Sequence, residues 1–415
     1  MERAATGVYY SDQDASDRAS KRLALRLSAA AALAGANASV VYATASIIGA
    51  SMAPSAGFAT LPLTSFVIGM ACGTLPIGAV ARRFGRRPAL LIGGFSGAVC
   101  GVTASIATLI WSFPLLCAAT FCGGVYAAAS QSYRFAAADG ASPRLQPKLI
   151  SWVLAGGVLA GIIGPQLVQH TMYLWPQHLF AATYLGQAVV AILAMLVLSG
   201  VKSPPPLAAA LTESARPLGE IVGQGRFVVA AICGTVSYGL MNLVMTSAPL
   251  AMKMCGLSLS QSNLGLQWHV LAMYAPSFFT GSLIVRFGVH RVVALGLLLE
   301  IVAAVIDLSG QSVWHFWAGL TALGLGWNFG FIGASAMIVA LHRPQERTKV
   351  QSFNDFIIFG TMAVGSFSSG QMLASGGWGL VNSIVFPLAA VALTSLFWSR
   401  ASAQAAQAAP VRGNG

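Results

Sequence analysis

Residues 78–87 read GAVARRFGRR, and residues 281–291 read GSLIVRFGVHR. The two stretches align at a constant offset of 203 residues, each with a glycine, then Arg-Phe-Gly, then a further basic side chain. Each lies between two apolar runs. A short turn between helices needs glycine for its backbone geometry, and arginines hold such a turn at an anionic membrane surface. The pattern indicates an internal repeat in which each half carries one basic turn.

The composition excludes a water-soluble protein. Of 415 residues, 56% are hydrophobic and only 8% are charged, with a mean hydropathy of +0.73. Soluble domains carry about 25% charged residues. The net charge of +12 would suggest nucleic acid in a soluble protein, but the basic residues lie in short clusters between apolar runs. We therefore expect a lipid bilayer as the surroundings and no nucleic-acid partner.

Hydrophobic runs predict the number of membrane crossings, since a hydrocarbon core of about 30 Å needs roughly 20 apolar residues per helix. The twelve runs are 25–49, 58–81, 88–109, 112–136, 149–170, 178–200, 226–251, 263–285, 291–309, 314–341, 350–374 and 378–398. They predict an all-α membrane protein with two pseudo-symmetric halves of six helices. The predicted divisions are an N-terminal tail (1–24), an N-terminal half (25–200), a central loop (201–225), a C-terminal half (226–398) and a C-terminal tail (399–415).

The positions of the cations give the orientation. With the N-terminus in the cytoplasm, every lysine and arginine except Lys253 falls on the cytoplasmic side, as the positive-inside rule requires. The prediction is a multi-pass protein of the bacterial inner membrane, with both tails and the central loop cytoplasmic.

The basic turn, the twelve runs and the half-repeat together resemble the major facilitator superfamily, whose signature between the second and third spans reads roughly G-x-L-A-D-R-x-G-R-R. The resemblance implies a central cavity near the middle of the bilayer and alternating access by rocking of the two halves. The gating residues that it implies are Gly78, Arg82, Arg83, Gly85, Arg86, Arg87, Arg286, Gly288 and Asp355.

The chain departs from the signature at one place, because the aspartate of the family falls at Arg82. Our hypothesis is that Asp355, near the start of the eleventh span, supplies the missing negative charge and pairs with Arg82. The alternative is that Asp355 only caps its helix while Arg82 meets a lipid phosphate.

Candidate substrate residues follow from the resemblance, in which spans 1, 4, 7 and 10 line the cavity. The polar and aromatic residues of those spans are Asn37, Tyr42, Tyr126, Gln131, Tyr238, Asn242, Trp327 and Asn328. An amide in hydrocarbon is costly unless it is hydrogen-bonded, so each residue serves either a ligand or a neighbouring helix.

Further candidates lie on the supporting spans 5 and 8 and on span 9, which is usually peripheral in the family. They are Gln166, Gln267, His269 and Glu300, of which His269 and Glu300 are candidates for proton coupling. A neutral, hydrogen-bonded His269 is the alternative for that residue. Asp307, near the outer end of the ninth span, is expected to be hydrated.

Spans 1, 4, 5, 7 and 10 carry no charged side chain at their middle, which favours a neutral, planar, hydrogen-bonding organic solute. Within the superfamily the chain is similar to bacterial vitamin carriers, riboflavin transporters in particular, which implies uptake of a small organic solute. The first alternative is drug efflux, which a partial Gly-Pro pattern at Gly161, Gly164 and Pro165 favours, although helix packing also explains these residues. A solute sensor is a further alternative.

The sequence favours neither an enzyme nor a cofactor. Neither a phosphate-binding loop nor a nucleophile-base arrangement is found, and the six cysteines lack the spacing of a metal site. We expect a monomer, with coupling to protons as one way of driving transport.

Overall fold

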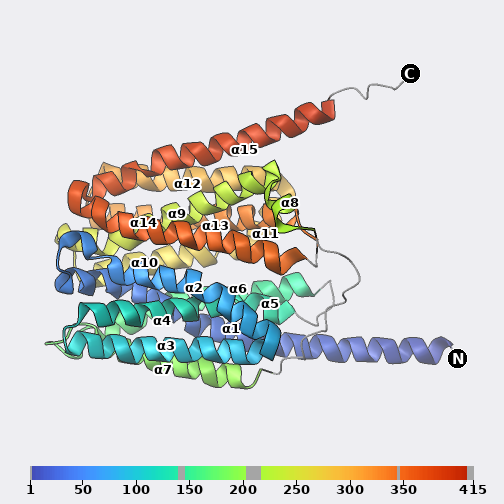
Figure 1. The fold of residues 1–415 in the computed structure, drawn as a ribbon, viewed down its shortest axis with the longest axis horizontal. Helices are drawn as coiled ribbons and strands as arrows, with labels where there is room; N and C mark the ends of the chain where they lie inside the picture. The colour runs from blue at the N-terminus through green and yellow to red at the C-terminus, as the bar shows by residue number, and fades with distance from the viewer. Residues whose placement is uncertain (1, 139–144, 202–215, 344–345, 409–415) are drawn as a thin grey trace.

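The computed structural model describes residues 2–138, 145–201, 216–343 and 346–408, and these form fifteen α-helices and one short 3-10 helix (Figure 1). No strand occurs in these ranges. Within hydrocarbon a helix satisfies its own backbone hydrogen bonds, which is why apolar runs of this length take this form. The fold class predicted from the sequence is confirmed.

The first half of the chain forms seven α-helices and the 3-10 helix. They are α1 (Glu2–Met52), η1 (Ala56–Phe58), α2 (Leu61–Phe84), α3 (Arg86–Leu109), α4 (Phe113–Gln131), α5 (Tyr133–Ala138), α6 (Gln146–Thr171) and α7 (Ala181–Ser199).

The second half forms the other eight. They are α8 (Leu218–Val222), α9 (Gly225–Met254), α10 (Leu259–Tyr274), α11 (Ser277–Phe287), α12 (Val289–Ser309), α13 (Val313–Val339), α14 (Arg347–Ser383) and α15 (Val385–Ala408). The long helix α1 begins at Glu2, inside the tail expected at 1–24, and α15 continues past residue 399.

The helices account for twelve crossings. Ten segments of the described chain are long and apolar enough to cross a membrane, and the bent pair of α10 and α11 makes an eleventh. One of the ten, Lys349–Trp398, has 50 residues, about 75 Å of helix and more than two crossings need. It turns at Gly377, whose φ is 67°, and its second arm continues in α15, which runs back toward the other end of the bundle along α9 and α12 (Figure 1). This segment therefore holds two crossings.

Two predicted spans are interrupted. The eighth, expected to run without a break over 263–285, bends by 44° between α10 and α11. Pro276 lies at this break, where it lacks the N–H that a continuous helix would use. The fourth, expected over 112–136, breaks at Ser132 between α4 and α5.

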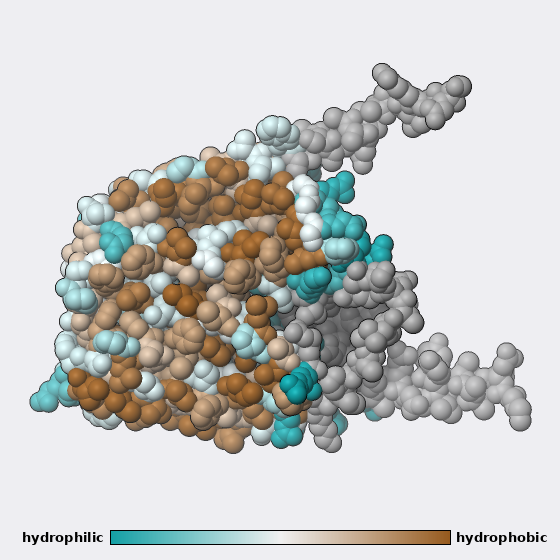
Figure 2. Space-filling model, in the orientation of Figure 1, coloured by the Kyte–Doolittle hydropathy of each residue, from teal (hydrophilic) through white to brown (hydrophobic). Residues whose placement is uncertain are grey.

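The two ends of the bundle differ in character. We call the end that carries the turn at residues 82–87 the basic end, and the opposite end the far end. The first turns of α1 and the last turns of α15 both lie at the basic end (Figure 1). Figure 2 shows hydrophobic side chains along the flank and hydrophilic ones gathered mainly at the basic end. Exposed apolar side chains such as Phe95, Val285 and Leu196 are those expected to face lipid.

The two halves meet chiefly along α2 with α14 and α6 with α10, and further contacts join η1 to α14, α1 to α9 and α10, and α6 to α11. Hydrogen bonds join the halves from the middle of the bundle to the far end. Gln169 donates to Ser260 Oγ at 2.7 Å, and Asn263 donates to the carbonyl of Pro165 at 2.7 Å. Thr60 donates to the carbonyl of Ser366 at 3.2 Å. The far end is therefore closed by polar contacts between the halves.

Candidate substrate site

Five aromatic side chains of the C-terminal half gather where the two halves meet. Tyr238 of α9 lies at their centre, 4.8 Å from Phe331, 5.3 Å from Trp327 and 6.1 Å from Phe359, measured between ring centroids. Trp327 stacks on Phe331 at 5.2 Å, and Tyr274 of α10 meets Trp327 edge-on at 6.0 Å. We call these five residues the aromatic cluster. They come from α9, α10, α13 and α14, so the cluster depends on the folded C-terminal half.

The N-terminal half adds a tyrosine and a hydrogen bond. Tyr42 of α1 donates its hydroxyl to Asn242 Oδ1 at 2.9 Å, across the boundary between the halves. It lies within electrostatic reach of Tyr238 and Tyr274 and packs edge-on against Phe66 at 5.6 Å. The amide nitrogen of Asn242 donates to the carbonyl of Met362 at 3.2 Å. Tyr42 and Asn242 thus join the aromatic cluster into one candidate site.

Trp327 carries a polar atom that the described protein does not satisfy. Its side chain is buried, and its Nε1 has no hydrogen-bond partner among the described residues. A buried N–H without a partner is costly, so an acceptor from a ligand or a water molecule would complete it. A flat solute with hydrogen-bonding edges could stack on these rings and accept from this atom.

Three other predicted substrate residues serve helix packing. Asn37 of α1 accepts a hydrogen bond from Gln187 Nε2 at 2.7 Å, within the N-terminal half. Tyr126 of α4 packs against α3, where a Cβ at Gly97 would meet its ring. Asn328 of α13 donates to the carbonyl of Met273 at 2.6 Å, beside the break in the eighth span.

Asn328 is fully hydrogen-bonded in this position. It also donates to Ser277 Oγ at 2.8 Å and accepts from Thr280 Oγ1 at 2.5 Å. These bonds supply polar partners at the helix break that Pro276 creates, which is how broken helices are stabilised inside a membrane. Gln131, the remaining predicted residue, is half-buried at the end of α4.

Two of the secondary candidates contact each other across the boundary between the halves, and His269 is buried within the C-terminal half. Gln166 Nε2 donates to Gln267 Oε1 at 2.9 Å, which joins α6 to α10 across the boundary. His269 is buried, with Nδ1 2.7 Å from the carbonyl of Leu320 and Nε2 without a partner among the described residues.

Two carboxyl groups are buried on α12. Glu300 Oε1 accepts from Ser237 Oγ at 2.6 Å, and its side chain is 0% exposed. Asp307 is 2% exposed, so the expectation that it is hydrated was wrong. The cause is helix α13, because a Cβ at Gly319 would collide with the Asp307 carboxyl group. The absence of that Cβ lets α13 cover the carboxyl group.

Arg134 is a charged residue of the basic end that the sequence analysis did not single out. Arg134, at the start of α5, acts electrostatically on Asp355 of α14, and on Tyr238 and Tyr274 of the aromatic cluster. It lies on the N-terminal half and the other three lie on the C-terminal half. Its effect on the other half depends on how the two halves pack, which hydropathy cannot reveal.

The predicted pairing of Asp355 with Arg82 stays a hypothesis, because the side chain of Arg82 lies outside the described residues. Asp355 itself is half-buried on α14.

The repeated turns have matching geometry in both halves. Gly85 and Gly288 end α2 and α11 with φ of 90° and 86°, backbone angles that only glycine adopts easily. The guanidinium of Arg83 lies 5.3 Å from the ring centroid of Phe84, and that of Arg286 lies 5.3 Å from that of Phe287. Gly78 lies inside α2, and Arg86 and Arg87 open α3.

A salt bridge at the basic end joins the segment before α8 to the start of α14. Arg216 Nε and Nη2 lie 2.8 and 2.7 Å from the two carboxylate oxygens of Glu346. These hydrogen bonds lower the pKa of the Glu346 carboxyl group well below its usual range and raise that of Arg216. The carboxylate therefore remains ionised, and the contact is kept, at any physiological pH.

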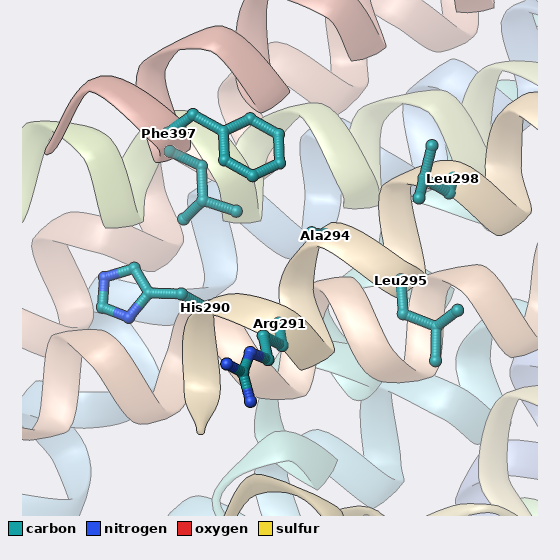
Figure 3. Close-up of a pocket in the computed structure, with 7 residues that line it drawn as sticks. His290, Arg291, Ala294, Leu295, Leu298 and Phe397 are labelled. Carbon is teal, nitrogen blue, oxygen red and sulfur yellow. The ribbon is translucent and has the colours of Figure 1, made fainter. Parts of the chain in front are cut away.

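A hollow of about 230 Å³ lies between α12 and α15 at the basic end, away from this site. Figure 3 shows Leu295 and Leu298 along α12, Phe397 reaching over from α15, and Arg291 at one end. Leu295, Leu298 and Phe397 are each more than 40% exposed, on the surface that faces lipid. No member of the aromatic cluster lines this hollow.

Comparison with known proteins places the chain among transporters. The family model described as Major Facilitator Superfamily matches residues 27–275 and 230–413. The riboflavin transporter RfnT of Brucella anthropi is 45% identical over 380 residues, which cover 91% of this chain and 96% of that protein. An uncharacterized MFS-type transporter of Bacillus subtilis, YddS, is 28% identical over 84% of each chain.

Solved structures show the same fold at low sequence identity. A D-xylose–proton symporter superposes with a TM-score of 0.72 at 16% identity, over 90% of this chain and 96% of that one. The xylose transporter XylE of E. coli gives a TM-score of 0.71 at 15% identity, over 95% of this chain and 98% of that one.

Proposed function

The chain belongs to the major facilitator superfamily, and from this premise we propose that it carries riboflavin, or a closely similar planar heteroaromatic solute, into the cell. As a member of that family it is a multi-pass membrane protein and a secondary transporter of a small solute. The proposal concerns the identity of the solute, the direction of transport and the residues that bind it.

One observation carries the proposal, namely the aromatic cluster with the unpartnered Nε1 of Trp327 beside Tyr42 and Asn242. The flavin ring system is flat, aromatic and edged with carbonyl groups and ring nitrogens. Its faces can stack on the rings of Trp327 and Phe331, and an acceptor on its edge can take a hydrogen bond from the indole N–H of Trp327. The 45% identity to a riboflavin transporter supports the same solute.

The proposal includes a location and a driving force. With the basic end in the cytoplasm of a bacterial inner membrane, the cations lie where the positive-inside rule puts them. The protein would act as a monomer coupled to protons, with each half moving as one body.

Riboflavin uptake by an auxotroph tests the proposal. Cells that lack their own carrier and express this chain are expected to accumulate labelled riboflavin, and a protonophore is expected to abolish the accumulation. Trp327→Ala is expected to raise KM about tenfold, since loss of an aromatic stack of about 1 kcal/mol and of one hydrogen bond weakens binding to that extent.

Trp314→Ala is the matched control, because Trp314 lies on the same helix, is 70% exposed and lies outside the aromatic cluster. It is expected to leave uptake unchanged. Equal uptake by wild type and Trp327→Ala would contradict the proposed site, and no uptake by wild type would contradict the proposed solute. Export of dyes by such cells would favour drug efflux.

A further inference from the structure

The inner face of α12 differs from the rest of its surface. Leu295 and Leu298 lie on the face that Figure 3 shows beside the hollow, and both are nearly half exposed. Glu300 and Asp307 lie on the face that packs on α13, and both are buried. They are seven residues apart, which is two helical turns or about 10 Å along one face. The helix therefore presents two acids to the interior of the C-terminal half.

Glu300 sits in a pocket formed by two glycines of α13. A Cβ at Gly326 would lie 2.9 Å from Glu300 Cγ, and one at Gly330 would collide with Ser237 Oγ. Side chains at these positions would displace the carboxyl group or its hydrogen-bond donor. Gly319 makes the same kind of space for Asp307.

The carboxyl groups have few partners. Glu300 Oε1 accepts from Ser237, while Glu300 Oε2 and both oxygens of Asp307 have no hydrogen-bond partner among the described residues. Ser237 is the one described side chain that hydrogen-bonds to Glu300, and no charged group of the described residues acts on it. No charged group in the described part of the chain acts on Asp307 either. An ion without a partner in such surroundings costs several kcal/mol.

The pocket of Glu300 lies directly behind the substrate site. Ser237, which donates to Glu300, precedes Tyr238 on α9, and Gly326, which packs on Glu300, precedes Trp327 on α13. On each helix one residue faces the acid and the next belongs to the aromatic cluster. Loss of the proton from Glu300, or of its hydrogen bond from Ser237, would therefore act on the backbone that positions Tyr238 and Trp327.

We propose that Glu300 and Asp307 form a proton-binding site between α12 and α13, separate from the substrate site, through which a proton gradient drives transport. The proton occupies Glu300 Oε2 while Oε1 keeps its hydrogen bond from Ser237. Loss of that proton leaves a carboxylate that water or a cation must reach, which favours a conformation with α12 and α13 opened. This proposal rests on the proposed riboflavin transport for its cargo.

Reconstituted protein separates the two proposals. Exchange of labelled for unlabelled riboflavin without any gradient tests the solute, and accumulation driven by a pH gradient tests proton coupling. Glu300→Gln keeps the shape and the acceptor for Ser237 but cannot release a proton. We expect the riboflavin exchange rate of this variant to lie within about twofold of the wild-type rate. Its accumulation of riboflavin in a pH gradient should be at least tenfold lower than that of wild type.

Asp307→Asn is expected to reduce the accumulation in the same direction. Glu220→Gln is the control, since Glu220 is exposed on α8 outside the spans, and it should behave as wild type. Wild-type accumulation in Glu300→Gln would overturn the proposal. So would a wild type that exchanges riboflavin but accumulates none in a pH gradient.

Failure of riboflavin exchange by the wild type would instead defeat the proposed solute, and infrared spectroscopy then decides the proton site. The purified wild type should show protonated-carboxyl absorption that changes with pH, and Glu300→Gln should lack the Glu300 part of it while keeping that of Asp307. The proposal would be overturned if the wild type showed no such absorption, if the absorption did not change with pH, or if the variant showed the same absorption as the wild type.

Discussion

At the scale of single residues, the intramembrane amides show what a sequence can and cannot assign. Asn37, Asn242 and Asn328 were each expected to serve either a ligand or another helix. Asn37 and Asn328 bond to neighbouring helices of their own half, and Asn242 bonds across the two halves. Hydropathy shows that such a group needs a partner. It cannot show which partner, because that depends on the rotation of each helix about its axis.

The hydrogen bond from Tyr42 to Asn242 gives a prediction at this scale. Tyr42→Phe leaves the buried Asn242 Oδ1 without its donor, which should cost about 1–3 kcal/mol of unfolding free energy. In a double-mutant cycle with Asn242→Ala, we expect a coupling energy of about 1 kcal/mol, measured by unfolding in detergent.

Tyr184→Phe is the control for this cycle. Tyr184 accepts a hydrogen bond from Thr44 at 2.9 Å inside the N-terminal half, so its effect should add to that of Asn242→Ala. Additive effects of Tyr42→Phe and Asn242→Ala would show that the hydrogen bond does not join the halves.

At the scale of helices and turns, the repeated sequence predicted the geometry of the turns, whereas hydropathy did not predict the breaks in two helices. The Arg-Phe-Gly repeat predicted two equivalent turns, and Gly85 and Gly288 adopt nearly the same φ. The breaks at Ser132 and Pro276 lie inside runs that were expected to form continuous helices, although residues 130–134 already make the end of the fourth span polar. Pro276 itself was a signal, because proline cannot continue the hydrogen bonds of a helix.

The turns give a prediction at this scale. Gly85→Ala and Gly288→Ala force a side chain into backbone angles that cost about 1–3 kcal/mol, so each should lower the Tm in detergent by several degrees. Gly281→Ala is the control, because a Cβ there meets open space within helix α11. It should leave the Tm unchanged or raise it slightly. Equal Tm values for all three variants would show that the turns are not constrained.

At the scale of the whole molecule, apolar runs and the spacing of cations were enough to predict twelve crossings and the two-half architecture. Contacts between the halves could not be predicted. Gln166 with Gln267 and Gln169 with Ser260 are distant in sequence and follow from how α6 meets α10. Arg134 was overlooked for the same reason, since its influence on Asp355 depends on the packing of the two halves.

The central claim is that the two halves move against each other to carry a flat solute past the aromatic cluster. Disulfide cross-linking at the far end tests it most directly, with Gln169→Cys and Ser260→Cys introduced after replacement of the six native cysteines. Reconstituted protein should exchange labelled riboflavin when reduced, stop when the disulfide forms, and resume when it is reduced again. Undiminished exchange by fully cross-linked protein would contradict the claim.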